Sequence, residues 1–306
     1  MASQRTMSYK VWNETIGHIL DSDEFKVQMQ TKGYFLSPEH RTFREYTNNM
    51  WGIISTMNTA NFLSKDFWHQ QSIVLRNKNY YLIRTGAGSF AIFDEHRFSR
   101  PYLNLQKDNH ILELPETAPN GFEYLKSAFN ENVLENTGLE QLRFNGIYDK
   151  MIETVIGTRQ QFYVGVRGNT TRSFDVYFKR RDSEIVKIRS YTGQAELDYT
   201  LWTGDSVFLF EAKKAEREGV KRYFDIGWHK FAYAAIRFIN YSRLKIYPVY
   251  FLRSPKQVFL FVFPQFKFHE NGVILNDVTQ MTPVYSFVVN LNQYKKSLRL
   301  RDFQSS

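Results

Sequence analysis

The chain contains no cysteine. This absence excludes disulfide frameworks, thiol nucleophiles and zinc sites built on cysteine, and it fits a reducing compartment. Long hydrophobic runs are missing as well, since the apolar run at residues 259–263 is far shorter than the roughly 20 residues that span a membrane. The first residues have no continuous apolar segment of the kind found in signal peptides. We therefore expect a soluble, cytoplasmic protein that has no membrane partner.

Several motifs of well-known enzymes are also absent. The chain has no G-x-x-x-x-G-K-[ST] phosphate-binding loop, no H-E-x-x-H metal motif and no G-x-S-x-G nucleophile motif. These absences argue against the chemistries that the motifs serve. A process driven by ATP would need a partner chain.

Acidic residues are the scarcer charged class, with 31 Asp and Glu against 40 Lys and Arg, which gives a net charge of +9. Such an excess favours polyanionic partners, nucleic acid before anionic membrane, although a basic surface can also serve solubility alone. Hydrophobic residues make up 42% and aromatic residues 17% of the 306 positions, so the chain can bury a sizeable core. The length allows one large domain or two ordinary ones.

The N-terminal part mixes helical and extended patterns. Residues 71–95 are rich in β-branched and aromatic side chains, contain turn signals, and predict a three-stranded β-meander. Arg76, Lys78 and Arg84 decorate this meander and are possible DNA contacts, or else they belong to a solvated sheet face. We place a domain boundary near residue 135 and expect residues 1–135 to form a DNA-recognition domain.

The C-terminal part, residues 136–306, has a clearer order of elements. Helical patterns cover residues 120–142, 145–157 and 222–241, and strand patterns cover 160–168, 173–181, 184–202, 206–214, 244–253 and 257–268. This order of helix, antiparallel strands, helix and strand predicts an α/β (α+β) fold with a mixed β-sheet flanked by helices.

A turn signal within this region sets the register of two strands. Residues 203–206, Thr-Gly-Asp-Ser, separate two strand patterns, and a four-residue hairpin loop there pairs Trp202 with Val207. The second strand ends in Glu-Ala-Lys-Lys, a string that by propensity alone would also suit a surface helix.

Continuing the register outward brings charged residues together. Asp198 falls opposite Glu211 and Glu196 falls opposite Lys213, with all four side chains on one face. Two adjacent carboxylates repel each other unless a cation lies between them. The natural occupant is Mg²⁺, a hard cation that prefers oxygen ligands and keeps several waters.

This part of the chain resembles the PD-(D/E)XK nuclease superfamily. It has an Asp, a short hairpin, an apolar strand that ends in Glu-x-Lys and then an amphipathic helix. Asp198, Glu211 and Lys213 stand at the motif positions, and Leu197 replaces the proline that gives the motif its first letter. The resemblance covers roughly residues 147–252. It implies a restriction-endonuclease-like core and metal-dependent hydrolysis of phosphodiester bonds.

The resemblance also implies roles for these residues. Asp198, Glu211 and the main-chain carbonyl of Ala212 would bind Mg²⁺, with Mn²⁺ able to substitute, and Lys213 would orient the attacking water and stabilise charge on the phosphate. Glu196 is a further acid of the same cluster.

Members of the superfamily often carry an additional acid on the helix before the sheet. Glu153 is the first candidate and Glu140 the second, and a solvent-facing helix residue is the alternative reading of Glu153. His229 and Lys230 lie where the following helix would approach the metal and DNA, or else form a surface pair. Lys214 points away from the cluster and is either a phosphate-facing base or a solvated one.

The resemblance favours a DNA endonuclease, most of all a type II restriction enzyme of a restriction–modification system. Cutting both strands of double-stranded DNA calls for two active sites, so we expect a homodimer. A repair, recombination or mobile-element nuclease of the same fold is the second hypothesis. A basic DNA-binding protein without catalytic activity is the third.

Overall fold

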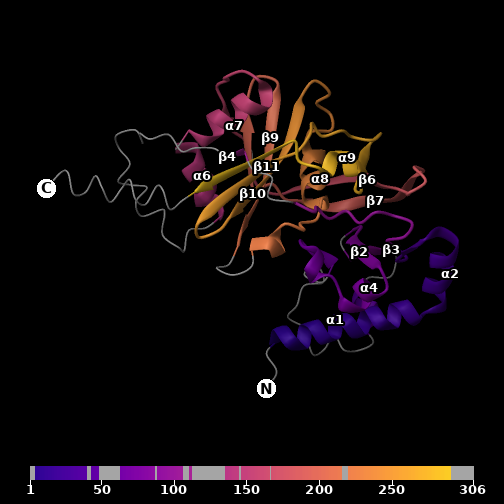
Figure 1. Cartoon of the computed structure of the whole chain (residues 1–306). Helices are drawn as coiled ribbons and strands as arrows, with labels where there is room; N and C mark the ends of the chain where they lie inside the picture. The colour runs from indigo at the N-terminus through magenta and orange to yellow at the C-terminus, as the bar shows by residue number, and fades with distance from the viewer. Residues whose placement is uncertain are drawn as a thin grey trace.

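The computed structural model describes residues 4–39, 43–47, 63–86, 88–105, 110–111, 135–144, 146–165, 167–215 and 220–290. In these ranges, helices combine with three β-sheets, two of three strands and one of seven (Figure 1). The predicted mixed sheet flanked by helices in an α+β fold is therefore confirmed. Within the described ranges, no helix has both the length and the apolar character needed to cross a membrane.

The first elements form a small sheet covered by helices. Strand β3 (Phe90–Asp94) lies between β1 (Tyr34–Leu36) and β2 (Tyr80–Arg84), antiparallel to both. The helical elements of this part are α1 (Gln4–Asp21), α2 (Asp23–Lys32), η1 (Phe43–Thr47), η3 (Trp68–Gln70) and α4 (Ile73–Asn77). One hydrophobic core joins side chains from α1, α2, α4 and all three strands.

The predicted meander at residues 71–95 is wrong in its first strand. Residues 73–77 form the short helix α4, because the Ser72 hydroxyl accepts a hydrogen bond from the Val74 amide at 3.2 Å and caps the helix. The third strand of the small sheet is β1, which comes earlier in the chain.

The large sheet contains seven strands in the order β4-β13-β11-β10-β9-β8-β5. These strands are β4 (His110–Ile111), β5 (Tyr163–Val164), β8 (Tyr199–Trp202), β9 (Ser206–Lys214), β10 (Lys245–Arg253), β11 (Gln257–Val262) and β13 (Tyr285–Asn290). Strands β5, β8 and β9 are antiparallel neighbours, whereas β9 and β10 are parallel. Parallel strands need a crossover connection, and this one contains η5 (Val220–Tyr223), α8 (His229–Ala235) and η6 (Ile236–Phe238).

Different elements cover the two faces of the large sheet (Figure 1). Helices α6 (Glu135–Phe144) and α7 (Ile147–Ile156) cover one face. Helix α8 lies on the other face, together with α9 (Val278–Met281) and a sheet of β12 (Gly272–Ile274), β6 (Thr170–Lys179) and β7 (Ile185–Ala195). The predicted helix at 145–157 is confirmed as α7, and the predicted helix at 120–142 falls mostly outside the described residues.

Side-chain alternation along β9 decides which residues face α8. Phe208 and Phe210 pack in the core beneath α6 and α7, while Val207 and Leu209 pack in the core on the side of α8. Successive side chains of a strand point to opposite faces. Glu211 and Lys213 continue the second series, so both point to the face that α8 covers.

The predicted hairpin between β8 and β9 is present. The Thr203 amide donates to the Ser206 carbonyl at 2.9 Å, and Trp202 pairs with Val207. The predicted strand at 184–202 is divided, because the chain leaves the β12-β6-β7 sheet after Ala195 and joins the large sheet at Tyr199. Residues 196–198 therefore lie between two sheets.

The predicted helix at 222–241 is shorter than expected. Ile226 and Gly227 form bridges with Phe67 and Tyr102, so the backbone at these positions pairs with the N-terminal part of the chain. This pairing delays the start of α8 to His229. A tertiary contact overrides a helical pattern here.

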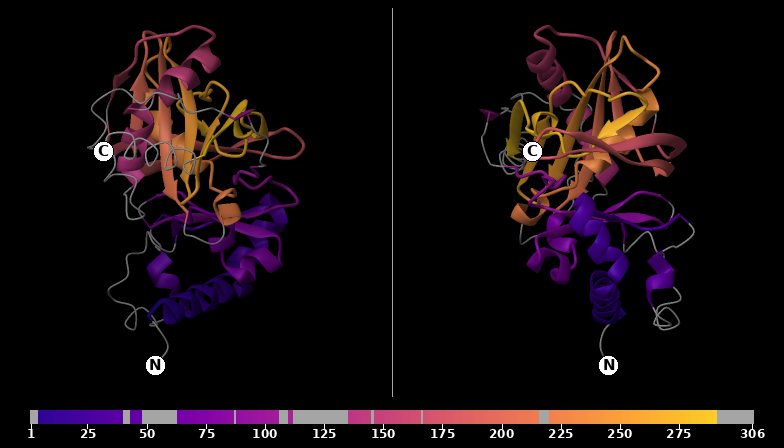
Figure 2. Two further views of the ribbon diagram at one scale, coloured as in Figure 1. Left: turned by 60° about the vertical axis from the view of Figure 1, so that its left-hand side comes forward. Right: turned by 90° about the vertical axis from the view of Figure 1, so that its right-hand side faces the viewer.

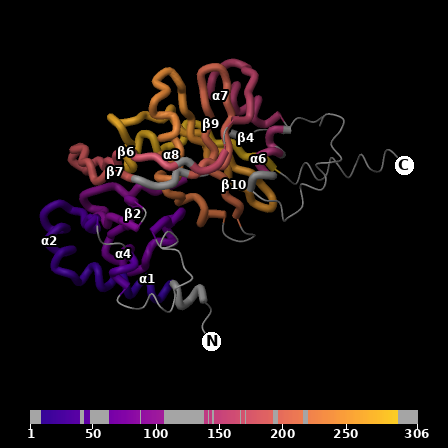
Figure 3. Tube along the Cα trace, turned by 180° about the vertical axis from the view of Figure 1, so that it is seen from behind, coloured from indigo at the N-terminus to yellow at the C-terminus, as the bar shows by residue number. Residues whose placement is uncertain are grey.

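The N-terminal elements lie at one end of the molecule in both views of Figure 2. In the view from behind, β6 and β7 lie next to β2 of the small N-terminal sheet (Figure 3). The Phe93 ring of β3 stacks on the Phe178 ring of β6 with centroids 4.1 Å apart. The predicted boundary at residue 135 lies beside the segment 112–134, which is outside the described residues, so the division into residues 1–135 and 136–306 stays a prediction.

Candidate functional site

Glu211 and Lys213 form the centre of a buried charged cluster on β9. The Lys213 Nζ atom lies 2.9 Å from Glu211 Oε1, and the Glu211 side chain is only 5% exposed. Burying a carboxylate requires compensating charge or hydrogen bonds. Glu211 and Lys213 lie two positions apart on the same face of β9, so the lysine supplies the charge that compensates the buried carboxylate.

Asp198 lies across the hairpin from Glu211. Strand pairing ends at Tyr199 and Phe210, so Asp198 and Glu211 are the next positions outward, as predicted. The Ala212 amide donates a hydrogen bond to Asp198 Oδ2 at 2.8 Å, which fixes the carboxyl group at this edge. Burial, and after it the charge of Glu211, raises the pKa of Asp198 to about 7.

Two further residues complete the cluster from other parts of the chain. Lys213 Nζ lies 3.2 Å from Asp66 Oδ2, and Lys230 Nζ lies 3.6 Å from Asp66 Oδ1 and 3.5 Å from Glu211 Oε1. Burial raises the pKa of the Asp66 carboxyl, but Lys230 and Lys213 outweigh it and hold this pKa below its usual value. Glu211 in turn raises the pKa of Lys230.

Sequence reasoning missed Asp66. No local pattern marks this residue, since it reaches the cluster only through long-range pairing. The Phe67–Ile226 bridge, and a hydrogen bond of 2.7 Å from the Gly227 amide to the Asp66 carbonyl, hold it beside α8.

The charges of the cluster do not balance when every group is ionised. Asp66, Asp198 and Glu211 are three carboxylates, whereas Lys213 and Lys230 are two ammonium groups. A proton on Asp198 makes the cluster neutral, which agrees with the raised pKa of that group. A bound cation would compensate the same excess charge.

The donor atoms at this edge suit a hard cation. Within the described ranges, no three side chains of His, Cys, Asp and Glu form a group that could hold a metal ion, so a site here would combine the two carboxylates with main-chain or water oxygens. The Ala212 amide points to Asp198, and the N–H and C=O of one strand residue point to the same side. The Ala212 carbonyl therefore faces the edge where Asp198 lies, and with Asp198 and Glu211 it makes an all-oxygen donor set that fits Mg²⁺ or Mn²⁺.

The other acids predicted from the sequence lie apart from Asp198 and Glu211. Glu153 is exposed on α7, which packs against the opposite face of the sheet, so the structure does not bring it to Glu211. Glu140 forms ion pairs with Arg143 and Arg167. Glu196 is exposed and lies between β7 and the start of β8, so it does not pair with Lys213 in a strand as predicted.

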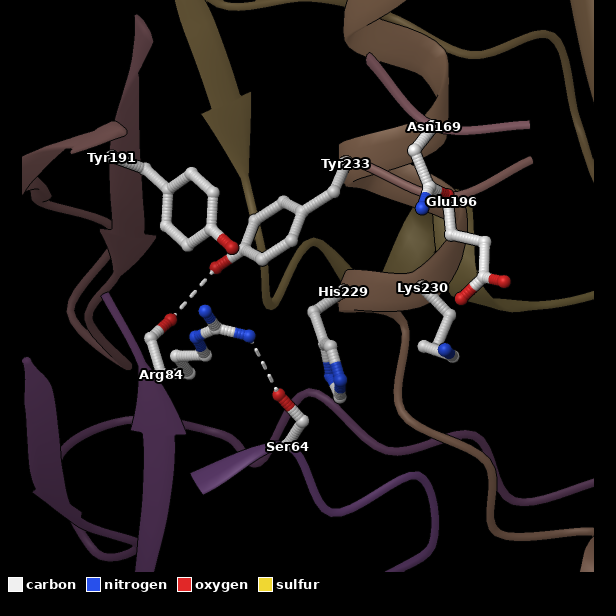
Figure 4. Close-up of a pocket in the computed structure, with 8 residues that line it drawn as sticks. All are labelled: Ser64, Arg84, Asn169, Tyr191, Glu196, His229, Lys230 and Tyr233. Atoms are coloured by element: carbon white, nitrogen blue, oxygen red, sulfur yellow. Dashed lines mark hydrogen bonds between the residues drawn. The ribbon is translucent and has the colours of Figure 1, made fainter. Parts of the chain in front are cut away.

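A pocket of about 180 Å³ opens beside the cluster (Figure 4). Its lining residues come from both parts of the chain and are Ser64, Arg84, Asn169, Tyr191, Glu196, His229, Lys230 and Tyr233. Lys230 connects the pocket to the cluster, because it lines the pocket and its Nζ atom lies 3.5 Å from Glu211 Oε1.

Two of the predicted DNA contacts, His229 and Lys230, begin helix α8 and line this pocket. Burial, followed by the charge of Lys230, lowers the pKa of His229 to about 4, so the imidazole is neutral at physiological pH. Of the others, Arg84 lines the pocket, Arg76 lies on α4, and Lys78 follows that helix.

Lys214 is exposed at the end of β9, outside the cluster. Its side chain is the next after Lys213 and therefore points to the opposite face of the strand. This position agrees with the expectation that Lys214 is not part of the acidic pair.

Most residues of the charged cluster lie in a segment of the chain that matches a known family model. Residues 100–281 match the family model described as domain of unknown function DUF6997. The chain belongs to the DUF6997 family. The DUF6997 segment contains Asp198, Glu211, Lys213 and Lys230, whereas Asp66, Ser64 and Arg84 precede it. No curated protein and no solved structure matches the chain.

Proposed function

We propose that this chain is a Mg²⁺-dependent endonuclease that hydrolyses phosphodiester bonds of DNA. The observation that carries the proposal is the pair of carboxylates, Asp198 and Glu211, that face each other at the end of a hairpin with Lys213 beside them. Burial first, and the charge of Glu211 second, raise the pKa of Asp198 to about 7, and a divalent cation between the two carboxylates would favour their ionised forms.

Each residue of the cluster has a chemical role in this proposal. Asp198, Glu211 and the Ala212 carbonyl would hold the ion, which when bound neutralises the phosphate and acidifies a water molecule. Lys213 orients the attacking water and stabilises negative charge that develops on the phosphate. Lys230, which approaches Glu211 at 3.5 Å, keeps a second positive charge at the same edge.

The order of elements supports a restriction-endonuclease-like core. Helix α7, antiparallel strands β5, β8 and β9, helix α8 and the parallel strand β10 follow one another, with β6 and β7 inserted between β5 and β8. This is the helix–strands–helix–strand order that the sequence patterns predicted, and it agrees with the core that the resemblance to the PD-(D/E)XK superfamily implies. We infer a type II restriction enzyme that acts as a homodimer on double-stranded DNA, since cutting both strands requires two sites.

Incubation of the purified protein with supercoiled plasmid tests the proposal. We expect nicked and linear products with Mg²⁺ or Mn²⁺ and none with EDTA. Protein that binds DNA but cuts no substrate of a broad panel would instead be a non-catalytic DNA-binding protein. Cutting confined to branched or single-stranded DNA would point to a repair, recombination or mobile-element nuclease.

The variant Lys213→Ala separates catalysis from binding. It removes the ammonium group beside Glu211, so we expect cleavage to fall by about 10²–10³-fold, with DNA affinity changed only a few-fold. Cleavage rates and fluorescence anisotropy of labelled duplexes measure the two effects. Lys26→Ala, an exposed change on α2, is the matched control and should keep full activity. Loss of binding together with folding in Lys213→Ala would assign this lysine a structural role.

A further inference from the structure

The pocket beside the cluster lies where the N-terminal part of the chain meets α8. Arg84 ends β2 and Ser64 belongs to the N-terminal segment, whereas Tyr191 comes from β7, and Tyr233 comes from α8. Figure 4 shows Tyr191 and Tyr233 next to each other, Glu196, Asn169 and Lys230 across from Tyr191, and Arg84 and Ser64 below them.

The two tyrosine rings form a rigid aromatic wall. Their centroids lie 4.6 Å apart, and both rings pack on Phe174 at 5.0 Å and 5.2 Å. The Tyr233 hydroxyl donates a hydrogen bond to the Arg84 carbonyl at 3.1 Å, which ties helix α8 to the end of β2. The wall is therefore formed before any ligand arrives, and a preformed site loses less entropy on binding.

Arg84 is held in a fixed orientation at the base of the pocket. Its Nε atom donates to the Gly86 carbonyl at 2.8 Å and its Nη1 atom donates to the Ser64 hydroxyl at 3.3 Å. A guanidinium group has five N–H donors in a planar fork. The remaining donors can bind a planar acceptor edge that enters the pocket.

His229 supplies a buried polar atom that lacks a partner. The residue is only 8% exposed, and its Nδ1 atom has no hydrogen bond within the described part of the chain. Buried polar groups are nearly always hydrogen-bonded, and each exception needs an explanation. This atom lies against Gly227, where a Cβ atom would be only 2.5 Å away, so a ligand in the pocket would contact another part of the His229 ring.

The size and chemistry of the pocket favour a single nucleobase. Its volume of about 180 Å³ is below the roughly 300–1,000 Å³ of sites for drug-sized ligands. A phosphate group would use Arg84 and Lys230 but would be repelled by Glu196 and gain little from the tyrosine rings. A base edge carries both donors and acceptors and its ring stacks on aromatic side chains, so it uses the cations, the carboxylate and the aromatic wall together.

We propose that this pocket binds one unpaired or extruded base of a DNA strand, whose backbone then runs past Lys230 to Asp198 and Glu211. The proposal deepens the proposed function and rests on it for the choice of DNA as ligand. Arg84 and the His229 ring border the edge of the base, and Tyr233, 7% exposed and backed by the buried Tyr191, contacts its ring. Enzymes that accept such a base gain selectivity for sites where unpairing is easy.

Binding to three matched duplexes tests this inference. They are a fully paired duplex, the same duplex with a one-nucleotide bulge, and the same bulge with an abasic nucleotide. Fluorescence anisotropy in EDTA measures affinity without cleavage. We expect the bulge that carries a base to bind about tenfold more tightly than both other duplexes, a difference of about 1.4 kcal/mol, since only this base can contact an aromatic side chain.

Two variants connect this preference with the pocket. Arg84→Met removes the fixed guanidinium group, and Asn169→Trp places a bulky side chain at the exposed rim of the pocket. Both should bring the ratio between the base-containing and abasic bulges close to one. Arg159→Met, the same change at an exposed residue after α7, is the control and should leave the ratio unchanged.

Several results would overturn the inference. Equal affinity for the two bulges would indicate a pocket that binds backbone phosphate or nothing, and a preference that survives both variants would place the base elsewhere. Equal affinity for all three duplexes, combined with Mg²⁺-dependent cleavage, would remove the base pocket and leave the nuclease proposal in place. No binding to any of them would remove the base pocket and DNA as the ligand together.

Discussion

At the scale of single residues, the candidate site is a buried ion network with one carboxylate more than it has ammonium groups. Asp198, Glu211 and Lys213 could be predicted from the sequence because a four-residue turn fixes their register. Arg84, Glu196, His229 and Lys230 were also candidates from the sequence, but Asp66, Ser64, Asn169 and the two pocket tyrosines were not, because only the folded chain brings their distant segments to α8. Local spacing therefore identified the residues of the hairpin and the start of the following helix, whereas the long-range partner Asp66 was missed.

The raised pKa of Asp198 predicts how stability depends on pH. In the folded protein this pKa is about 7, whereas an unfolded chain has an Asp pKa of about 3.9. The folded state thus keeps a proton that the unfolded state loses. In EDTA, the contribution of Asp198 to the free energy of unfolding should therefore be largest below pH 4. It should then fall by a few kcal/mol as pH rises to 7 and level off above it.

Denaturant unfolding of Asp198→Asn checks this prediction, because the variant should lose most of that decline between pH 4 and 7. Asp205→Asn is the control. Hydrogen bonds from Lys245 and Ser206 lower the pKa of Asp205, so its contribution has the opposite sign and the decline should persist. A decline of equal size in wild type and Asp198→Asn would show that Asp198 does not carry the effect.

At the scale of elements, turns and caps decided where the sequence predictions held. The β8–β9 hairpin and α7 follow from local signals, the turn at residues 203–206 and the apolar pattern of residues 147–156. The α4 segment has strand-like composition, yet the Ser72 cap makes it helical. The long helix expected at 222–241 is interrupted because Ile226 and Gly227 pair with the N-terminal part.

Close packing at the start of α8 predicts that adding a single methyl group at Gly227 destabilises the protein. A Cβ atom at Gly227 would lie 2.4 Å from Cε1 and 2.5 Å from Nδ1 of the buried His229 ring. Gly227→Ala should therefore destabilise the protein by ~1–3 kcal/mol and weaken binding to the bulged duplex.

Thermal and denaturant unfolding measure the change. Gly17→Ala in α1 has no atom within 4 Å of the new methyl group and should stabilise the protein by up to about 1 kcal/mol. Equal stabilities of Gly227→Ala and wild type would show that His229 is not confined as described.

At the scale of the whole molecule, the net charge of +9 and the contact between the two parts of the chain bear on the substrate. A basic protein gathers polyanions at its surface, and this attraction weakens as salt concentration rises. The candidate site and the pocket both combine residues from before and after residue 135, because Asp66, Ser64 and Arg84 meet Lys230 there. The N-terminal part therefore contributes directly to the site, beyond any role in DNA recognition.

Single-turnover cleavage of a labelled DNA substrate, with protein in excess, tests the central claim most directly. Wild type and Glu211→Gln are compared in Mg²⁺, after thermal unfolding has shown that both are folded. We predict that wild type cleaves the DNA, that EDTA abolishes cleavage, and that Glu211→Gln is slower by at least about 10²-fold, because a ligand of the ion is lost. A folded wild-type protein that leaves DNA intact in Mg²⁺, or a Glu211→Gln variant as fast as wild type, would contradict the account.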